Sequence, residues 1–65
     1  MKQKIKQTIL TILQNKRNGG DVLPFATSIE VAHLLNMSAV EVEKIAQDIE
    51  GIVAGKGLNH DYYYE

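Results

Sequence analysis

The chain contains no cysteine and no tryptophan, and it has a single proline among its 65 residues. Without cysteine it can form neither a disulfide nor a thiolate metal site. Its two histidines, His33 and His60, match no metal-ligand spacing, so we expect no metal and no other cofactor. A chain of this length buries only about 60% of its unfolded surface, and small domains commonly gain stability from a partner. Size alone therefore suggests a homodimer.

Long hydrophobic runs are also absent. No stretch approaches the roughly 20 apolar residues of a membrane-spanning helix. The N-terminal segment is interrupted by polar residues and lacks the small-residue cleavage site of a signal peptide. We therefore expect a cytoplasmic protein without a membrane partner, folded as a single domain over residues 1–65.

Charge is unevenly distributed, although the formal net charge is only −1. Five of the seven basic residues lie in residues 1–20, which contain no acid. All eight acidic residues lie in residues 21–65. Such asymmetry is typical of a partner-binding surface, but it is equally consistent with two halves that neutralise each other on folding.

The first apolar pattern predicts a helix over about residues 2–17. Four apolar residues fall on one side of this helix at 100° per residue: Ile5, Ile9, Ile12 and Leu13. The aliphatic stem of Lys16 could extend the same side with its charge outward. The Asn-Gly-Gly sequence at residues 18–20 accepts the left-handed backbone that commonly ends a helix.

The only proline, Pro24, lies in a segment whose residues favour an extended backbone. Because proline cannot donate to a sheet ladder, this segment should be a short edge strand or a plain loop. Phe25 is the only phenylalanine, and we expect it in the core.

Two helix starts share the capping-box pattern, in which a hydroxyl residue is followed three positions later by a glutamate. The first, at Thr27 and Glu30, predicts a helix over about residues 28–36. The second, at Ser38 and Glu41, predicts a longer helix of about thirteen residues. Ser28 and Ser38 have no histidine or aspartate nearby to activate them, so we expect structural roles for both and no serine nucleophile.

The end of the chain has the period of β-structure rather than of a helix. Strand-favouring residues at 52–54 and the consecutive Tyr62, Tyr63 and Tyr64 enclose a turn-rich stretch. This pattern predicts a hairpin over about residues 52–64. Tyr62 and Tyr64 should lie on one side and Tyr63 on the other, and we expect the tyrosines to serve in the core or at a dimer interface.

The expected elements are a helix, a short extended piece, a helix, a tight turn, a helix and a hairpin. This mainly α arrangement with a small β-hairpin resembles the winged helix-turn-helix family of DNA-binding domains, of the small bacterial or phage type, over nearly the whole chain. The apolar sites of a helix-turn-helix are filled by Val31, Leu35, Met37, Val42 and Ile45. Ala32 stands where the family has a small residue, and Asn36 stands at the turn position usually held by glycine, which needs a positive φ.

The resemblance implies that the helix of about residues 39–51 enters the major groove of double-stranded DNA. The side of this helix that faces away from the core centres on Val40, Lys44 and Gln47. These residues could contact a thymine methyl, a guanine or phosphate, and an adenine, respectively. Glu43, on the flank of that side, could accept a hydrogen bond from a cytosine amine.

Further DNA contacts are expected at the start of this helix and in the hairpin. Ser38 and Ala39 could hold a phosphate at the helix N-terminus. Lys56 lies between two glycines, and with Asn59 and His60 it could approach the DNA backbone. The alternative for this loop is a simple turn in which the glycines supply conformational freedom.

The charge of the third helix opposes a DNA-binding role, because its acids outnumber its single lysine. An ordinary solvated surface is the alternative for this helix. Two functions therefore stay open: a small DNA-binding transcription regulator, and a winged-helix protein-interaction or dimerisation module that does not bind DNA. We do not expect an enzyme, because the sequence contains neither a nucleophile–base pair nor a pair of carboxylates flanking a cleft.

Overall fold

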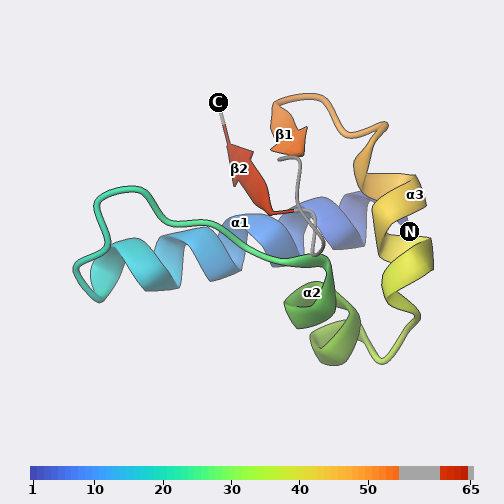
Figure 1. Ribbon diagram of the computed structural model, residues 1–65, viewed down its shortest axis with the longest axis horizontal. Helices are drawn as coiled ribbons and strands as arrows, with labels where there is room; N and C mark the ends of the chain where they lie inside the picture. Colours follow the sequence, from blue (N-terminus) through green and yellow to red (C-terminus); the bar gives the residue numbers. More distant parts are fainter. Residues whose placement is uncertain (55–60, 65) are drawn as a thin grey trace.

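A computed structural model describes residues 1–54 and 61–64 of the chain. It is mainly helical, as predicted. The elements in chain order are α1 (Lys2–Asn18), α2 (Ser28–Leu35), α3 (Ala39–Ala46), β1 (Ile52–Ala54) and β2 (Tyr62–Tyr64). The longest helix, α1, packs against α2, α3 and β2. The C-terminal end of α1 and helix α3 lie toward opposite ends of the molecule's long axis (Figure 1).

Helix α1 follows the predicted apolar pattern and the predicted stop. Its four buried residues are Ile5, Ile9, Ile12 and Leu13. Beyond the last turn, Gly20 adopts a φ of 108°. The amide of Gly20 donates to the carbonyl of Arg17, and the amide of Asp21 donates to the carbonyl of Lys16. This pair of bonds is a Schellman motif, in which a glycine with positive φ satisfies the last carbonyls of the helix.

The capping box predicted at the start of α2 is confirmed. The amide of Glu30 donates to the Thr27 hydroxyl at 3.1 Å, and the amide of Thr27 donates to the Glu30 carboxylate at 3.2 Å. Two otherwise unpaired backbone amides are thereby satisfied.

The turn between α2 and α3 depends on Asn36 in the left-handed conformation, with φ 53° and ψ 51°. The amide of Met37 then donates back to the carbonyl of Ala32 at 3.0 Å. Asparagine tolerates this conformation better than most residues, so the positive φ predicted for Asn36 is confirmed. Ala32 is buried, in agreement with the expected small residue at this position.

Helix α3 differs from its prediction at both ends. At its start, the Ser38 hydroxyl accepts from the amide of Val40 rather than from that of Glu41, so the predicted second capping box is wrong. Its end was predicted near residue 51, but the helix stops at Ala46. The amide of Ile49 donates to the carbonyl of Ala46, a three-residue bond that tightens the chain into 3₁₀-like turns. These turns bury Ile49.

Gly51 then completes the change of direction into β1. It has a φ of 88°, which glycine adopts without the steric cost that a Cβ would impose. A helix continuing through this position could not make the same turn toward the sheet.

The two strands pair antiparallel, with Ile52 opposite Tyr64 and Ala54 opposite Tyr62. On its other side, β2 pairs with Ala26 alone, through bonds in both directions between Ala26 and Tyr62. Two residues earlier, Pro24 has no N–H with which to extend this pairing. In this segment, Ala26 therefore forms an isolated β-bridge at the edge of the sheet, and no longer strand develops.

The core is a single cluster drawn from the three helices, β2 and two residues of the connecting segments, Ala26 and Ile49. Its members are Ile5, Ile9, Ile12, Leu13, Ala26, Val31, Ala32, Val42, Ala46, Ile49 and Tyr62. The core position predicted for Phe25 is wrong, because its side chain is 39% exposed. Neighbours along an extended chain point to opposite faces. The bridge that directs Ala26 and Tyr62 inward therefore directs Phe25 and Tyr63 outward, and their rings meet at 6.1 Å.

Candidate nucleic-acid interface

Helix α3 presents one side to the core and the opposite side to solvent. Val42 and Ala46 are buried. Val40 is 60% exposed, and Lys44 and Gln47 are exposed as well. The sequence-predicted exposure of these three residues is confirmed, although Gln47 caps the end of α3 instead of lying within it. We call Val40, Lys44 and Gln47 the outer line of α3.

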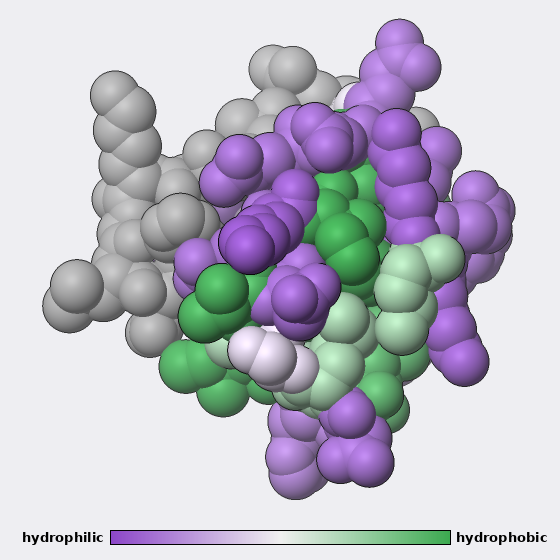
Figure 2. All heavy atoms as spheres, turned by 90° about the vertical axis from the view of Figure 1, so that its right-hand side faces the viewer, coloured by the Kyte–Doolittle hydropathy of each residue, from purple (hydrophilic) through white to green (hydrophobic). Residues whose placement is uncertain are grey.

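The face of the molecule that carries α3 is chemically mixed. Figure 2 shows hydrophilic residues over most of this face, with hydrophobic residues between them. The acids Glu41, Asp48 and Glu50 are exposed beside the outer line. A partner at this face therefore meets apolar, basic, amide and acidic groups together.

At the start of α3, Ser38 is exposed and Ala39 is partly buried. The Ser38 hydroxyl accepts a hydrogen bond of 3.2 Å from the Val40 amide. Ser38 thus satisfies one of the amides that an anion at this helix end would otherwise bind. Its clearest role in the structure is to begin α3.

Glu43 lies on the inner flank of α3 and is partly buried. The hydroxyl of Ser28, from the first turn of α2, donates to its Oε1 at 3.3 Å. Ser28 itself is almost fully buried. This contact ties α2 to α3 and turns the charge of Glu43 away from the outer line.

Tyr62 lies next to this pair and brings a third element to it. Its phenolic oxygen is buried and has no hydrogen-bond partner within the described part of the chain. Burial, and to a smaller extent the nearby Glu43 carboxylate, raises the pKa of Tyr62 to about 12. The Ser28 hydroxyl opposes this pKa shift weakly, but its geometry falls short of a formed hydrogen bond. Sequence patterning did not reveal this cluster of Ser28, Glu43 and Tyr62.

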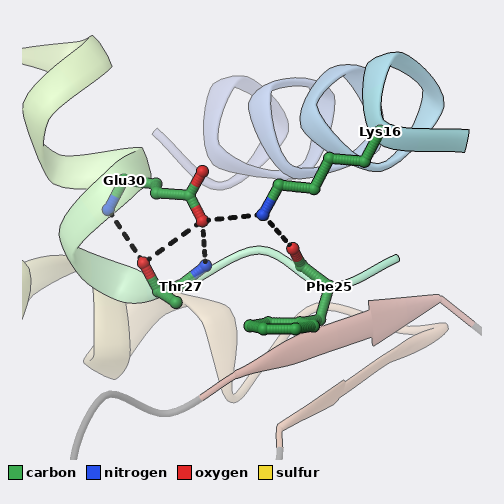
Figure 3. Close-up of polar contacts among 4 residues, drawn as sticks. All are labelled: Lys16, Phe25, Thr27 and Glu30. Atoms are coloured by element: carbon green, nitrogen blue, oxygen red, sulfur yellow. Dashed lines mark hydrogen bonds and ion pairs between the residues drawn. The ribbon is translucent and has the colours of Figure 1, made fainter. Parts of the chain in front are cut away.

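Lys16 is the one cation of α1 held by an ion pair in residues 1–54 and 61–64. Its Nζ donates to Oε1 of Glu30 at 3.1 Å and to the carbonyl oxygen of Phe25 at 2.6 Å (Figure 3). The same nitrogen lies 4.9 Å from the centroid of the Phe25 ring, which is within the range of a cation–π contact. Because Glu30 also closes the Thr27 capping box, Lys16 links the end of α1 to the start of α2.

The remaining lysines of α1 lie at its other end, beside the segment that follows α3. Lys2 and Lys4 are exposed and Lys6 is partly buried. Lys2 and Lys6 line a shallow depression of about 330 Å³ together with Ile49 and Glu50. Helix α1 packs against α3, and the N-terminus lies at the same end of the molecule as α3 (Figure 1). Folding therefore brings the basic end of α1 next to the acidic end of the α3 region.

Several predicted contact residues cannot be placed in this interface. Lys56, Asn59 and His60 lie outside the described residues. Tyr62 is in the core, and Tyr63 is partly exposed against Phe25.

No helix among the residues described is long and apolar enough to cross a membrane. Those residues also contain no group of three or more histidine, aspartate or glutamate side chains placed to hold a metal ion. Comparisons of the chain with protein-family models, curated proteins and solved structures give no match.

Proposed function

We propose that this chain is a small winged helix-turn-helix protein that binds double-stranded DNA in the cytoplasm, as a transcription regulator, and places α3 in the major groove. The element order, the antiparallel pair after α3 and the left-handed Asn36 support the fold assignment. The function rests on binding and involves no catalytic step.

The observation that carries the proposal is the composition of the outer line of α3. A major groove about 12 Å wide admits a helix and displays a distinct pattern of donors, acceptors and methyl groups for each base pair. The Gln47 amide could pair with adenine, Lys44 could reach guanine or a phosphate, and Val40 could contact a thymine methyl. All three side chains are exposed in the structure.

Electrostatics limits the affinity but does not exclude binding. Because Ser28 holds Glu43 on the inner flank, one acid fewer faces a DNA partner. Lys2, Lys4 and Lys6 lie at the same end of the molecule as α3 and could supply phosphate contacts. With about three or four such contacts, counterion release predicts an affinity loss of roughly 40- to 150-fold between about 50 and 200 mM salt.

The test compares the Lys44→Ala/Gln47→Ala double variant with the wild type on a pool of short random duplexes. Base contacts of this kind are each worth about 1–3 kcal/mol, so we expect the loss of two of them to weaken binding by roughly 30-fold or more. Thr11→Ala/Asn15→Ala is the matched control, because both residues are exposed on α1. If the two double variants bound DNA with equal affinity, α3 would not be the surface that contacts DNA.

A protein-interaction module that does not bind DNA is the second candidate, and one observation favours it. Ile29, Leu34 and Val40 are large apolar side chains exposed on α2 and α3. Exposed apolar groups rimmed by polar ones commonly mark protein contacts. Under this alternative, Val40→Lys would abolish partner binding, whereas Lys44→Ala would leave it unchanged.

A further inference from the structure

A second apolar surface lies at the end of the molecule opposite α3. It is formed by the segment after α1 and by β2. Val22 is 86% exposed and Leu23 is 82% exposed. Phe25 and Tyr63, whose rings contact one another, continue the same surface and are 39% and 38% exposed. Clustered exposure of this kind, unlike scattered single residues, indicates a contact surface.

These residues border a groove of about 470 Å³. The groove is lined by Leu10, Leu13, Gln14, Arg17, Leu23, Pro24 and Tyr63. Leu13 and Pro24 are buried and form the base of the groove. Leu23, in contrast, lies at the edge of the groove and is largely exposed to solvent. We call the groove and the exposed Val22, Leu23, Phe25 and Tyr63 the end surface.

Two opposite charges flank the end surface. Arg17 lines the groove, and Asp21 directly precedes Val22 in the chain. Both side chains are exposed, and neither has an ion-pair partner within 4 Å in the part of the chain that the structure describes. A surface that carries an apolar centre with both signs of charge at its border is complementary to itself. This is the property that a two-fold symmetric interface requires, because each residue there meets the partner's copy of its counterpart.

We propose that the end surface binds a second copy of this chain in a two-fold symmetric dimer. Leu23 of one protomer enters the groove of the other, and Arg17 of each protomer pairs with Asp21 of its partner. A small ligand fits less well, because such ligands are usually 70–90% enclosed, and a groove bordered by a projecting Leu23 is too open for that.

A dimer interface of standard size would cover only a modest part of this chain's surface. A standard interface buries about 800 Å² per partner, which is less than a fifth of the 4495 Å² that the chain exposes. The end surface includes large side chains from α1, the following segment and β2, and such side chains are the usual anchors of an interface. A 65-residue chain without a disulfide also gains the most from covering them.

This inference does not rest on the proposed DNA contact. The end of α1 and the segment after it lie toward the opposite end of the molecule from α3, with β2 between them (Figure 1). A dimer formed through the end surface therefore leaves α3 accessible. If α3 binds DNA, the dimer supplies two copies of α3 and doubles the number of lysines available to phosphates.

Sedimentation equilibrium of the full chain, at protein concentrations from roughly 10 μM to 1 mM, tests the dimer by mass action. The wild type should rise from 7.3 kDa toward twice that mass. Leu23→Lys should weaken the dimer by at least about 30-fold, as expected for a central interface residue. Leu34→Lys is the matched control, because Leu34 is 62% exposed on α2, and it should dimerise like the wild type.

A charge exchange tests the predicted pairing. Arg17→Asp should weaken the dimer by placing like charges together, and Arg17→Asp/Asp21→Arg should restore it. Circular dichroism of each variant verifies folding, which exposed positions should not disturb. Any one of four results would overturn the proposal. The wild type could stay at 7.3 kDa at every concentration, or Leu23→Lys could still dimerise. Alternatively, Leu34→Lys could fail to dimerise, or the charge exchange could fail to restore the dimer. DNA binding by α3 is measured on separate variants, so either proposal can fail alone.

Discussion

The hydroxyl of Ser28 donates to Oε1 of Glu43 across 3.3 Å and joins the first turn of α2 to the inner flank of α3. The contact orients α3 so that its outer line faces solvent. It also removes the Glu43 carboxylate from the surface that we propose for DNA.

Replacing Glu43 should therefore lower stability without weakening DNA binding by the folded protein. In Glu43→Ala the buried Ser28 hydroxyl loses this acceptor, which should reduce the free energy of unfolding by about 1–3 kcal/mol. Urea denaturation measures the change. The control Glu41→Ala removes an exposed acid from the same helix and should change stability by less than about 0.5 kcal/mol. Equal effects of the two substitutions would contradict a structural role for Glu43.

The buried phenol of Tyr62 predicts a loss of stability at alkaline pH. Because burial raises its pKa from 10.0 to about 12, the folded state keeps the proton over a range in which the unfolded state loses it. The unfolded state then binds fewer protons, so stability falls as pH rises from 10 toward 12 and is unaffected by this group below that range. The full effect is at most about 3 kcal/mol.

Tyr62→Phe isolates this contribution from those of lysines and other tyrosines. The difference in unfolding free energy between wild type and Tyr62→Phe should shift with pH only above about pH 10. Near pH 7 the variant should match or exceed the wild type, since the lost hydroxyl has no hydrogen-bond partner among the residues described. A constant difference across the whole pH range would show that the phenol is not buried.

Lys16 should stabilise the fold through the charge of its ammonium group as well as through the packing of its aliphatic chain. Lys16→Met keeps most of the aliphatic chain but removes the ion pair with Glu30 and the contact with the Phe25 ring. We expect a loss of about 0.5–1 kcal/mol in thermal or urea denaturation, because both partners are partly solvated. Lys4→Met, at an exposed position of the same helix, should have a smaller effect. If it costs as much as Lys16→Met, the ion pair contributes nothing.

Asn36 should be replaceable by glycine but not by alanine. Its φ of 53° costs a residue with a Cβ roughly 1 kcal/mol or more, and asparagine and glycine tolerate it best. Asn36→Ala should therefore lower the unfolding free energy by about 1–2 kcal/mol, while Asn36→Gly stays within about 0.5 kcal/mol of the wild type. A stable Asn36→Ala variant would mean that the turn can adopt another conformation.

The features that the sequence predicts correctly are determined by neighbouring residues. The Thr27–Glu30 box and the left-handed Asn36 each depend on contacts within about one helical turn, and the apolar spacing of α1 follows from helix geometry alone. The exposure of Val40, Lys44 and Gln47 follows from the same geometry.

The features that it misses depend on contacts between distant segments. Phe25 is outward and Tyr62 inward because Ala26 bridges Tyr62, and no local pattern specifies that bridge. Glu43 occupies a flank of α3 that could face either solvent or core. The buried Ser28, fifteen positions away, settles its orientation. The early end of α3 likewise depends on the tertiary burial of Ile49, which overrides local helix preference.

Contact between the outer line of α3 and DNA can be detected residue by residue in an amide NMR titration with a short random duplex. Spectra are recorded at about 20 mM and about 200 mM salt, because backbone contacts weaken steeply over this range. We predict that shifts at about 20 mM cluster on Val40, Lys44, Gln47 and residues 2–6, and that they fade at about 200 mM. An absence of shifts at the lower salt concentration, or shifts confined to residues 17–25, would contradict the proposed contact.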